Sequence, residues 1–420
     1  MTHGTMRLTT RLLTTRVMTT RLVASCCVWS ALCGGVPLAA QDTIRVRSTA
    51  APRWGADVKL TQVWAIGQVD GPDEIAFGRV DNATVDARGR MYVYDSNDGQ
   101  IRQYAPDGKF VRNIGRKGKG PGEYEWVFGM DIADDSLLTT FDLNNARVSY
   151  FAPDGKLRTS FTDPRLTTGF DGIFVVDRRG LAYVGVPRRG ARGEQMDELA
   201  GASRPSVLML RKDGTTADSL DLPPRISSAP RTRFYLLTAD GGNSNFQVES
   251  HSATLRSGGY VFGNGDAYRF VIRPLTGPVR VVERASSSVA VGSEERANWR
   301  VYGDYFTAQS GGRNAYEIPA TKPVFRNLFT DHDNRIWVSL YARAQKLDLP
   351  PRPAGDKRPL LLWQQRATYD VFTTQGEYLA RVELPARSRM LASRGNRLWV
   401  LSKGADDEDI IRLYTISGVK

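Results

Sequence analysis

Carboxylates are the side chains of this chain that could most readily do chemistry. They stand within or beside short β-rich runs at Asp81, Asp131, Asp171 and Glu249. Carboxylate oxygens are the ligands that Ca²⁺ takes in proteins, but the spacing of these four residues does not define a site. We therefore expect no bound metal and no cofactor, and we keep a Ca²⁺ ion held by these residues as the weaker alternative.

Other catalytic groups are scarce. Only His251 and His332 come after the first forty residues, too few for a three-histidine zinc site. No G-x-S-x-G sequence is present, and all three cysteines lie within the first forty residues. A hydrolase or lyase that uses carboxylates stays open, because paired acids from distant segments leave no readable spacing.

A glycine-rich segment at residues 115–123, GRKGKGPGE, could bring backbone N–H groups close to an anion. A phosphate-binding loop needs Lys-Ser or Lys-Thr after the glycines and a helix that begins there, and the sequence shows neither. We expect a connector between two sheets, in which Glu123 accepts backbone hydrogen bonds or points towards the centre of the fold. Glu123 is also kept as a candidate ligand-binding residue.

The elements that must position these residues are read from an internal repeat. Residues 82–115 read as strand, RG turn, strand, polar loop, strand, DG turn, strand, and weaker copies continue to the C-terminus. The turns between outer strands fall at Asp107-Gly108, Asp154-Gly155, Asp213-Gly214, Thr276-Gly277, Gln375-Gly376 and Ser417-Gly418. Tight hairpins favour such residues because they need positive φ. Six copies predict an all-β fold, a single six-bladed β-propeller of four-stranded antiparallel blades.

The ends of the chain are expected to close the ring. The last copy leaves room for only three strands before Lys420, whereas residues 58–67, VKLTQVWAIG, resemble a fourth strand. Pairing them with the last blade would remove an exposed sheet edge. We therefore predict a signal peptide at 1–40, a linker at 41–57 and one propeller domain at 58–420.

Residues 115–157 carry a more specific likeness. They contain the glycine-rich GPGE segment and the sequence D-x-x-N-x-R-V at Asp142, Asn145, Arg147 and Val148. This stretch resembles one repeat of the NHL-type propellers, and the chain is similar to exported bacterial six-bladed propellers with such a loop. The first copy departs from the pattern because it lacks the Asn and the Arg. We expect Asp142 to accept loop N–H groups and Arg147 to reach that carboxylate.

Long insertions are predicted to gather on one face of the propeller. They occupy about 187–204, 222–246, 285–324 and 342–359, always between strands two and three of a blade or between strand four and the next blade. In a four-stranded blade these connections emerge on the same face, and long connections often carry function. Candidate ligand-binding residues there are Arg188, Arg189, Arg192, Lys346, Arg352, Lys357 and Arg358. Residues 293–309 predict a helix whose aromatic residues pack onto the propeller.

The first forty residues indicate export. They hold four arginines, no acidic residue, an apolar run at 22–36 and small residues before Gln41, which are the parts of a signal peptide. The run, roughly 15 residues, is shorter than the about 20 that span a bilayer. We expect cleavage after Ala40 and a periplasmic or secreted protein without a transmembrane span. A lipid anchor on Cys26, which comes after a lipobox-like Val-Ala-Ser, is the weaker alternative.

Charge and fold together set the functional hypothesis. Without the leader arginines, 53 basic and 45 acidic residues leave a net charge of +8. This positive charge favours an anionic partner. No nucleic-acid-binding motif is present, so we do not expect that partner to be nucleic acid. The hypothesis is a monomeric, non-enzymatic propeller whose loop-bearing face binds a protein, an anionic glycan or an anionic small molecule. The alternative is a hydrolase or lyase, with or without a metal, whose site lies at the mouth of the central channel.

Overall fold

The computed structural model describes residues 42–167, 173–187, 205–223, 246–309, 318–349 and 354–419. The predicted signal peptide lies outside these ranges, as do Arg188, Arg189, Arg192, Arg352 and Asp171.

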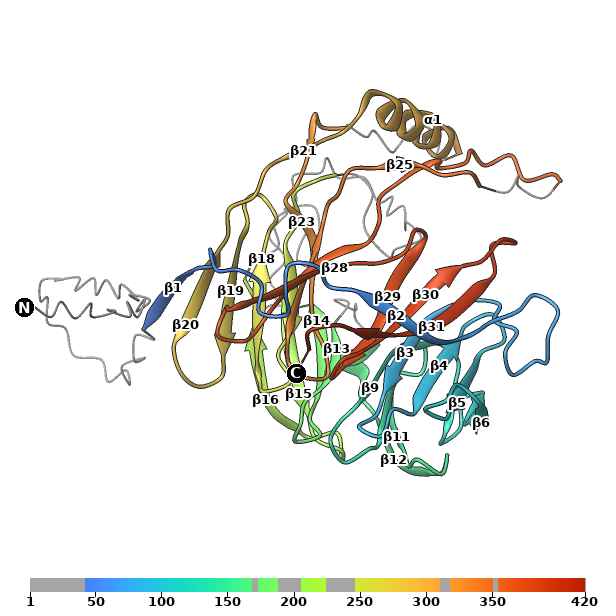
Figure 1. Ribbon diagram of the computed structural model, residues 1–420. Helices are drawn as coiled ribbons and strands as arrows, with labels where there is room; N and C mark the ends of the chain where they lie inside the picture. The colour runs from blue at the N-terminus through green and yellow to red at the C-terminus, as the bar shows by residue number, and fades with distance from the viewer. Residues whose placement is uncertain are drawn as a thin grey trace, which may run out of the picture.

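Six antiparallel sheets surround a common axis, which confirms the predicted all-β six-bladed propeller (Figure 1). The first three blades consist of β3 (Val80–Val85), β4 (Met91–Asp95), β5 (Gln100–Tyr104) and β6 (Phe110–Ile114); β9 (Val127–Ile132), β10 (Leu138–Asp142), β11 (Arg147–Phe151) and β12 (Leu157–Thr162); and β13 (Phe174–Val176), β14 (Ala182–Pro187), β15 (Pro205–Leu210) and β16 (Thr216–Asp221). The other three consist of β17 (His251–Thr254), β18 (Gly259–Gly263), β19 (Arg269–Pro274) and β20 (Val279–Glu283); β23 (Phe325–Thr330), β24 (Ile336–Leu340), β27 (Thr368–Phe372) and β28 (Tyr378–Glu383); and β29 (Ser388–Arg394), β30 (Arg397–Lys403) and β31 (Asp409–Ile416) with β2 (Leu60–Ile66).

The two ends of the chain meet in the sheets. β2 pairs antiparallel with β31 as the fourth strand of the last blade, as predicted. A strand that sequence analysis did not predict, β1 (Thr43–Arg47), pairs parallel with β20 as a fifth strand of the fourth blade. It lies in the segment that we assigned to a linker, so the propeller also uses residues before position 58.

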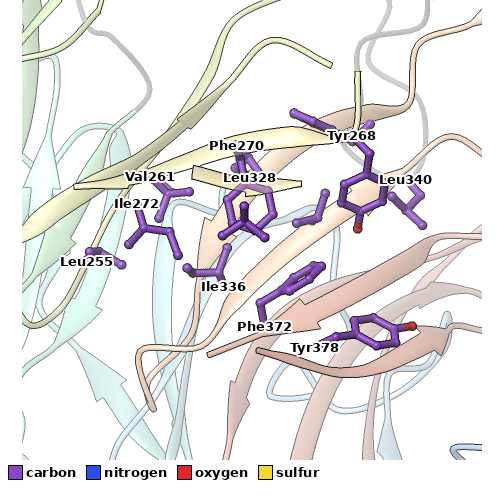
Figure 2. Close-up of a cluster of buried hydrophobic side chains, with 14 residues drawn as sticks. Leu255, Val261, Tyr268, Phe270, Ile272, Leu328, Ile336, Leu340, Phe372 and Tyr378 are labelled. Atoms are coloured by element: carbon purple, nitrogen blue, oxygen red, sulfur yellow. The ribbon is translucent and has the colours of Figure 1, made fainter. Parts of the chain in front are cut away.

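The core lies between neighbouring blades rather than inside a single sheet. The second strands β4, β10 and β24 are buried at every position because a blade lies against each of their faces. Between the fourth and fifth blades, Phe270 of β19 meets Phe372 of β27 with ring centroids 5.2 Å apart (Figure 2). Such packing holds each blade against its neighbours.

The loop-bearing face carries further short elements. They are β7 (Arg116–Lys117), β8 (Glu123–Tyr124), the 3-10 helix η1 (Pro164–Thr167), β21 (Val289–Ala290), α1 (Ser293–Gln309), β22 (Thr321–Lys322), β25 (Gln345–Lys346) and β26 (Trp363–Gln364). In Figure 1, α1, β21 and β25 lie together above the blades. No helix in the described ranges has the length and apolar composition of a membrane span.

Candidate functional site

A pocket of about 750 Å³ lies on the loop-bearing face, where connections of the fourth and fifth blades meet. Four described parts of the chain line it: the segment before β17, the β18–β19 connection, the end of β20 with the residues after it, and the segment that leads into β23. The lining residues include Phe246, Asp266, Tyr268, Arg269, Glu283, Arg284, Ser286, Ser288, Thr321 and Lys322. The face on which we predicted the functional residues to lie thus carries a pocket.

The helix α1 holds one wall of this pocket in place. Arg296 donates hydrogen bonds to the carbonyl oxygens of Ile318 and Pro319, the latter at 2.8 Å. Trp299 is buried and packs edge-on against Phe246, which itself lines the pocket. The helix predicted at 293–309 is confirmed with those bounds, and its packing role is confirmed at Trp299.

Lys322 in the pocket wall is a buried cation with a buried partner. Its Nζ lies 2.7 Å from Oε1 of Glu295 in α1 and donates to the carbonyl oxygen of Ala342 at 2.9 Å. Burial lowers the pKa of Lys322 because it disfavours the charged amine, and Glu295 opposes that shift. The pair therefore fastens α1 to the pocket rather than offering a free amine to a ligand.

A carboxylate network lies beneath the pocket. Asp370 is fully buried and accepts hydrogen bonds from the hydroxyls of Tyr268, at 2.7 Å, and Tyr378, at 3.2 Å. Arg381 donates to both of its oxygens, at 2.8 and 3.0 Å. Burial, with the charge of Asp370 second, raises the pKa of Tyr268 well above its usual value and that of Tyr378 to about 12. Both phenols are therefore neutral hydrogen-bond donors at physiological pH.

The groups on the pocket surface suit binding more than catalysis. Arg269 pairs with Glu283 at 3.0 Å, and Ser286, Ser288 and Thr321 add exposed hydroxyls. The lining residues within the described ranges include no histidine and no cysteine. Ion pairs and hydroxyls in a concave site can fix the orientation of a small polar ligand.

A second polar group lies at the axis near the opposite face, where the turns between first and second strands gather. We call Thr84, Asp131, Arg256, His332 and Arg394 the axial cluster. Arg256 makes an ion pair with Asp131 and donates to the carbonyl oxygen of Val176 at 3.0 Å. His332 lies 3.4 Å from Oγ1 of Thr84 through Nε2 and 3.2 Å from Nη2 of Arg394 through Nδ1. Thr84 Oγ1 also donates to Oδ1 of Asp131 at 3.5 Å, so these contacts link residues of all six blades across the axis.

The axial cluster changes the interpretation of the predicted metal ligands. Asp131 is occupied by Arg256 and by the N–H groups of Val176 and Ile132. Asp81 pairs with Arg79 at 2.9 Å, and Glu249 lies in the connection that leads into β17. Within the described ranges, no group of three or more histidine, cysteine, aspartate or glutamate residues could hold a metal ion. The structure therefore does not bring the described members of the predicted set together.

The glycine-rich connector is built from backbone contacts. Glu123 accepts the N–H of Gly120 at 2.8 Å and pairs with Arg116, as one of the two predicted arrangements requires. Asp142 accepts loop N–H groups from Glu125 and Asn144, as predicted. The expected contact between Asp142 and Arg147 is wrong, because Arg147 donates to the carbonyl oxygen of Gly120 instead.

The described members of the predicted basic set, Lys346, Lys357 and Arg358, are not among the lining residues of the pocket. Lys346 lies exposed in β25, and Arg358 pairs with Asp356 at 2.6 Å. Lys357 is exposed in the same connection between β24 and β27 of the fifth blade. Sequence reasoning missed Tyr268, Arg284 and Lys322, because nothing in their local sequence shows that they converge.

The comparison with protein families supports the fold. A family model described as a 6-bladed beta-propeller matches residues 69–195. A Bacteroides vulgatus protein of the duf4221 family has 11% identity and a TM-score of 0.47, over 86% of this chain and 99% of that one. A Bacteroides fragilis protein provisionally named as exported has 10% identity and a TM-score of 0.46, over 89% and 99%.

A lyase is also among the similar structures. Virginiamycin B lyase from Staphylococcus aureus has 11% identity and a TM-score of 0.40, over 86% of this chain and 99% of that one. A search of curated proteins found no significant match. At these identities and scores the comparisons assign no activity and no ligand to this chain. The NHL type stays a prediction.

Proposed function

We propose that this protein is an exported β-propeller that binds a small polar ligand in the pocket of its loop-bearing face and does no chemistry on it. The pocket itself carries the proposal. Its volume of about 750 Å³ falls within the roughly 300 to 1,000 Å³ of small-molecule sites. It also lies where the long 285–324 insertion returns to the propeller.

The composition of the pocket supports binding over the hydrolase or lyase alternative. The carboxylates that line it in the described ranges are Asp266 and Glu283, and Glu283 is paired with Arg269. An acid-base pair needs two carboxyl groups that can exchange protons with a substrate, whereas Glu283 is engaged by Arg269. An ion pair next to hydroxyls instead presents donors and acceptors to a ligand.

Filling the pocket tests this proposal. Ser288 lines it and is exposed, so Ser288→Trp should occupy the site without disturbing the core. Ser287→Trp is the matched control, because Ser287 is the exposed neighbour that does not line the pocket. Thermal shift and calorimetry with a panel of sugars, amino acids and organic acids should find a ligand for the wild type and the control whose affinity falls at least tenfold in Ser288→Trp.

The result that would overturn the proposal is equally specific. It is wrong if the panel ligands bind the wild type and Ser288→Trp with equal affinity, or if none of them binds the wild type. Turnover of a bound ligand, measured by mass spectrometry, would favour the hydrolase or lyase alternative.

A further inference from the structure

We infer that the pocket ligand carries a single anionic group, a carboxylate or a group of the same charge, and that Arg284 binds it. This inference rests on the proposed function. It starts from the charges around the pocket, most of which are neutralised within the protein. Arg269 pairs with Glu283, Lys322 with Glu295, and Arg381 with Asp370. Among the described lining residues, Arg284 is the cation that belongs to none of these three pairs.

Arg284 is held in place, and it shares its ion-pair partner Asp370 with Arg381, which lies closer to that carboxylate. The guanidinium carbon of Arg284 lies 3.6 Å from the ring centroid of Tyr378, and Nη1 donates to the carbonyl oxygen of Ser48 at 2.9 Å. Its Nε lies 4.0 Å from Oδ2 of Asp370, beyond hydrogen-bond length. The oxygens of Asp370 are already taken by Arg381 and two phenols.

A stacked guanidinium of this kind is suited to a planar anion. Within the described part of the chain, the side chain of Arg284 makes one hydrogen bond, although a guanidinium has five N–H donors. Stacking on Tyr378 fixes the plane of the group before a ligand arrives, so little rotamer entropy is lost on binding. Carboxylates accept two parallel N–H bonds from such a fork.

Asp266 limits the charge of the ligand. It lines the same pocket, is exposed, and accepts the N–H of Ala267 at 2.7 Å. A second negative charge on the ligand would be repelled by this carboxylate, whereas a hydroxyl or an ammonium group could donate to it. The ligand class is therefore a monoanionic hydroxy acid or an amino acid.

Matched acids and amides test the assignment. The probes are gluconate, lactate and alanine, each measured beside its amide by calorimetry. The wild type should bind at least one acid about tenfold more tightly than its amide, since hydrogen bonds to charged groups exceed neutral ones by about that factor. Arg284→Gln should lose this preference. Arg284→Lys should keep the positive charge but show a smaller preference for the acid. Arg366→Gln is the control, because Arg366 is an exposed cation paired with the exposed Glu383.

The outcomes separate this inference from the proposed function. Equal binding of acids and amides, or an unchanged preference in Arg284→Gln, would disprove the role of Arg284 and leave pocket binding intact. The same holds if only neutral sugars bind and Ser288→Trp blocks them. If Arg284→Gln is destabilised because it loses the contact with Tyr378, the Arg284→Lys variant is measured instead. A reduced preference for the acid in Arg284→Lys would support the role of Arg284, and an unchanged preference would disprove it.

Discussion

At the scale of single residues, the axial cluster shows how the propeller buries polar groups at its axis. His332 is enclosed between Thr84 and Arg394, and Arg256 lies close enough to influence its charge. Burial, with the charges of Arg256 and Arg394 after it, lowers the pKa of His332 well below its usual value. The imidazole is therefore neutral in the folded protein at physiological pH.

This neutral histidine predicts a dependence of stability on pH. The unfolded chain binds a proton at His332 near pH 6.5, whereas the folded protein binds it only at lower pH. The contribution to stability is therefore complete above about pH 6.5 and is lost as the pH falls, by at most about 1.4 kcal/mol per pH unit. Urea unfolding from pH 8 to pH 5 should show this loss in the wild type and in His251→Gln. His332→Gln should lack this component, and an identical pH profile in all three proteins would contradict the explanation.

At the scale of elements, α1 connects two parts of the loop-bearing face. Its Arg296 binds the segment at 318–319, and Asn298 accepts the N–H of Leu362 at 2.8 Å and donates to the carbonyl oxygen of Leu360. Glu295 adds the buried ion pair with Lys322. The helix therefore fixes the position of one pocket wall relative to the paired strands β25 and β26 and the segment between them.

Removing the main apolar contact of α1 should loosen both parts. Trp299 is 7% exposed, and replacing a buried Trp by Ala typically costs about 3–5 kcal/mol. Hydrogen exchange should show faster exchange in α1 and at residues 318–322 in Trp299→Ala. Val301→Ala is the control, because Val301 is 56% exposed and should change little. Unchanged protection of α1 in Trp299→Ala would show that the polar contacts alone hold the helix.

At the scale of the whole molecule, the ring is closed by strands from both ends of the chain. β2 joins β31 at the last blade, and β1 adds an edge strand to the fourth blade. Both N-terminal strands pair with residues more than 200 positions away. Closure removes the open sheet edge that the three C-terminal strands would otherwise expose.

Glycine at the end of β2 provides a test of this closure. Gly67 has φ +135°, and a Cβ there would lie 2.4 Å from the carbonyl oxygen of Asp409, the first residue of β31. Gly67→Ala should therefore destabilise the protein by more than the about 1–2 kcal/mol of backbone strain alone. Gly55→Ala gives the comparison, because Gly55 has φ +101° and open space around it. Equal melting temperatures for the two variants would show that the close approach at Gly67 is easily relieved.

The architecture of this protein could be predicted from the sequence, because local chemistry carries it. The turn at Asp107-Gly108 needs positive φ, and Gly108 has φ +86° in the structure. The repeated turns and β-rich runs predicted the six blades. The aromatic residues at three- and four-residue spacing predicted the helix at 293–309, and the likeness of residues 58–67 to a fourth strand predicted the closing strand. Each of these depends on neighbouring residues or on a short pattern. β1 escaped prediction because a parallel edge strand carries no turn signal.

The candidate site and the partners of the charged residues depend instead on contacts between distant segments. Asp131 and Arg256 are 125 positions apart, and Tyr268 and Asp370 are 102 apart, so no local spacing could pair them. The predicted metal ligand Asp131 became half of an ion pair for the same reason. These polar side chains find their partners across blade boundaries, and the distance along the chain between two blades depends on insertions that the fold does not constrain.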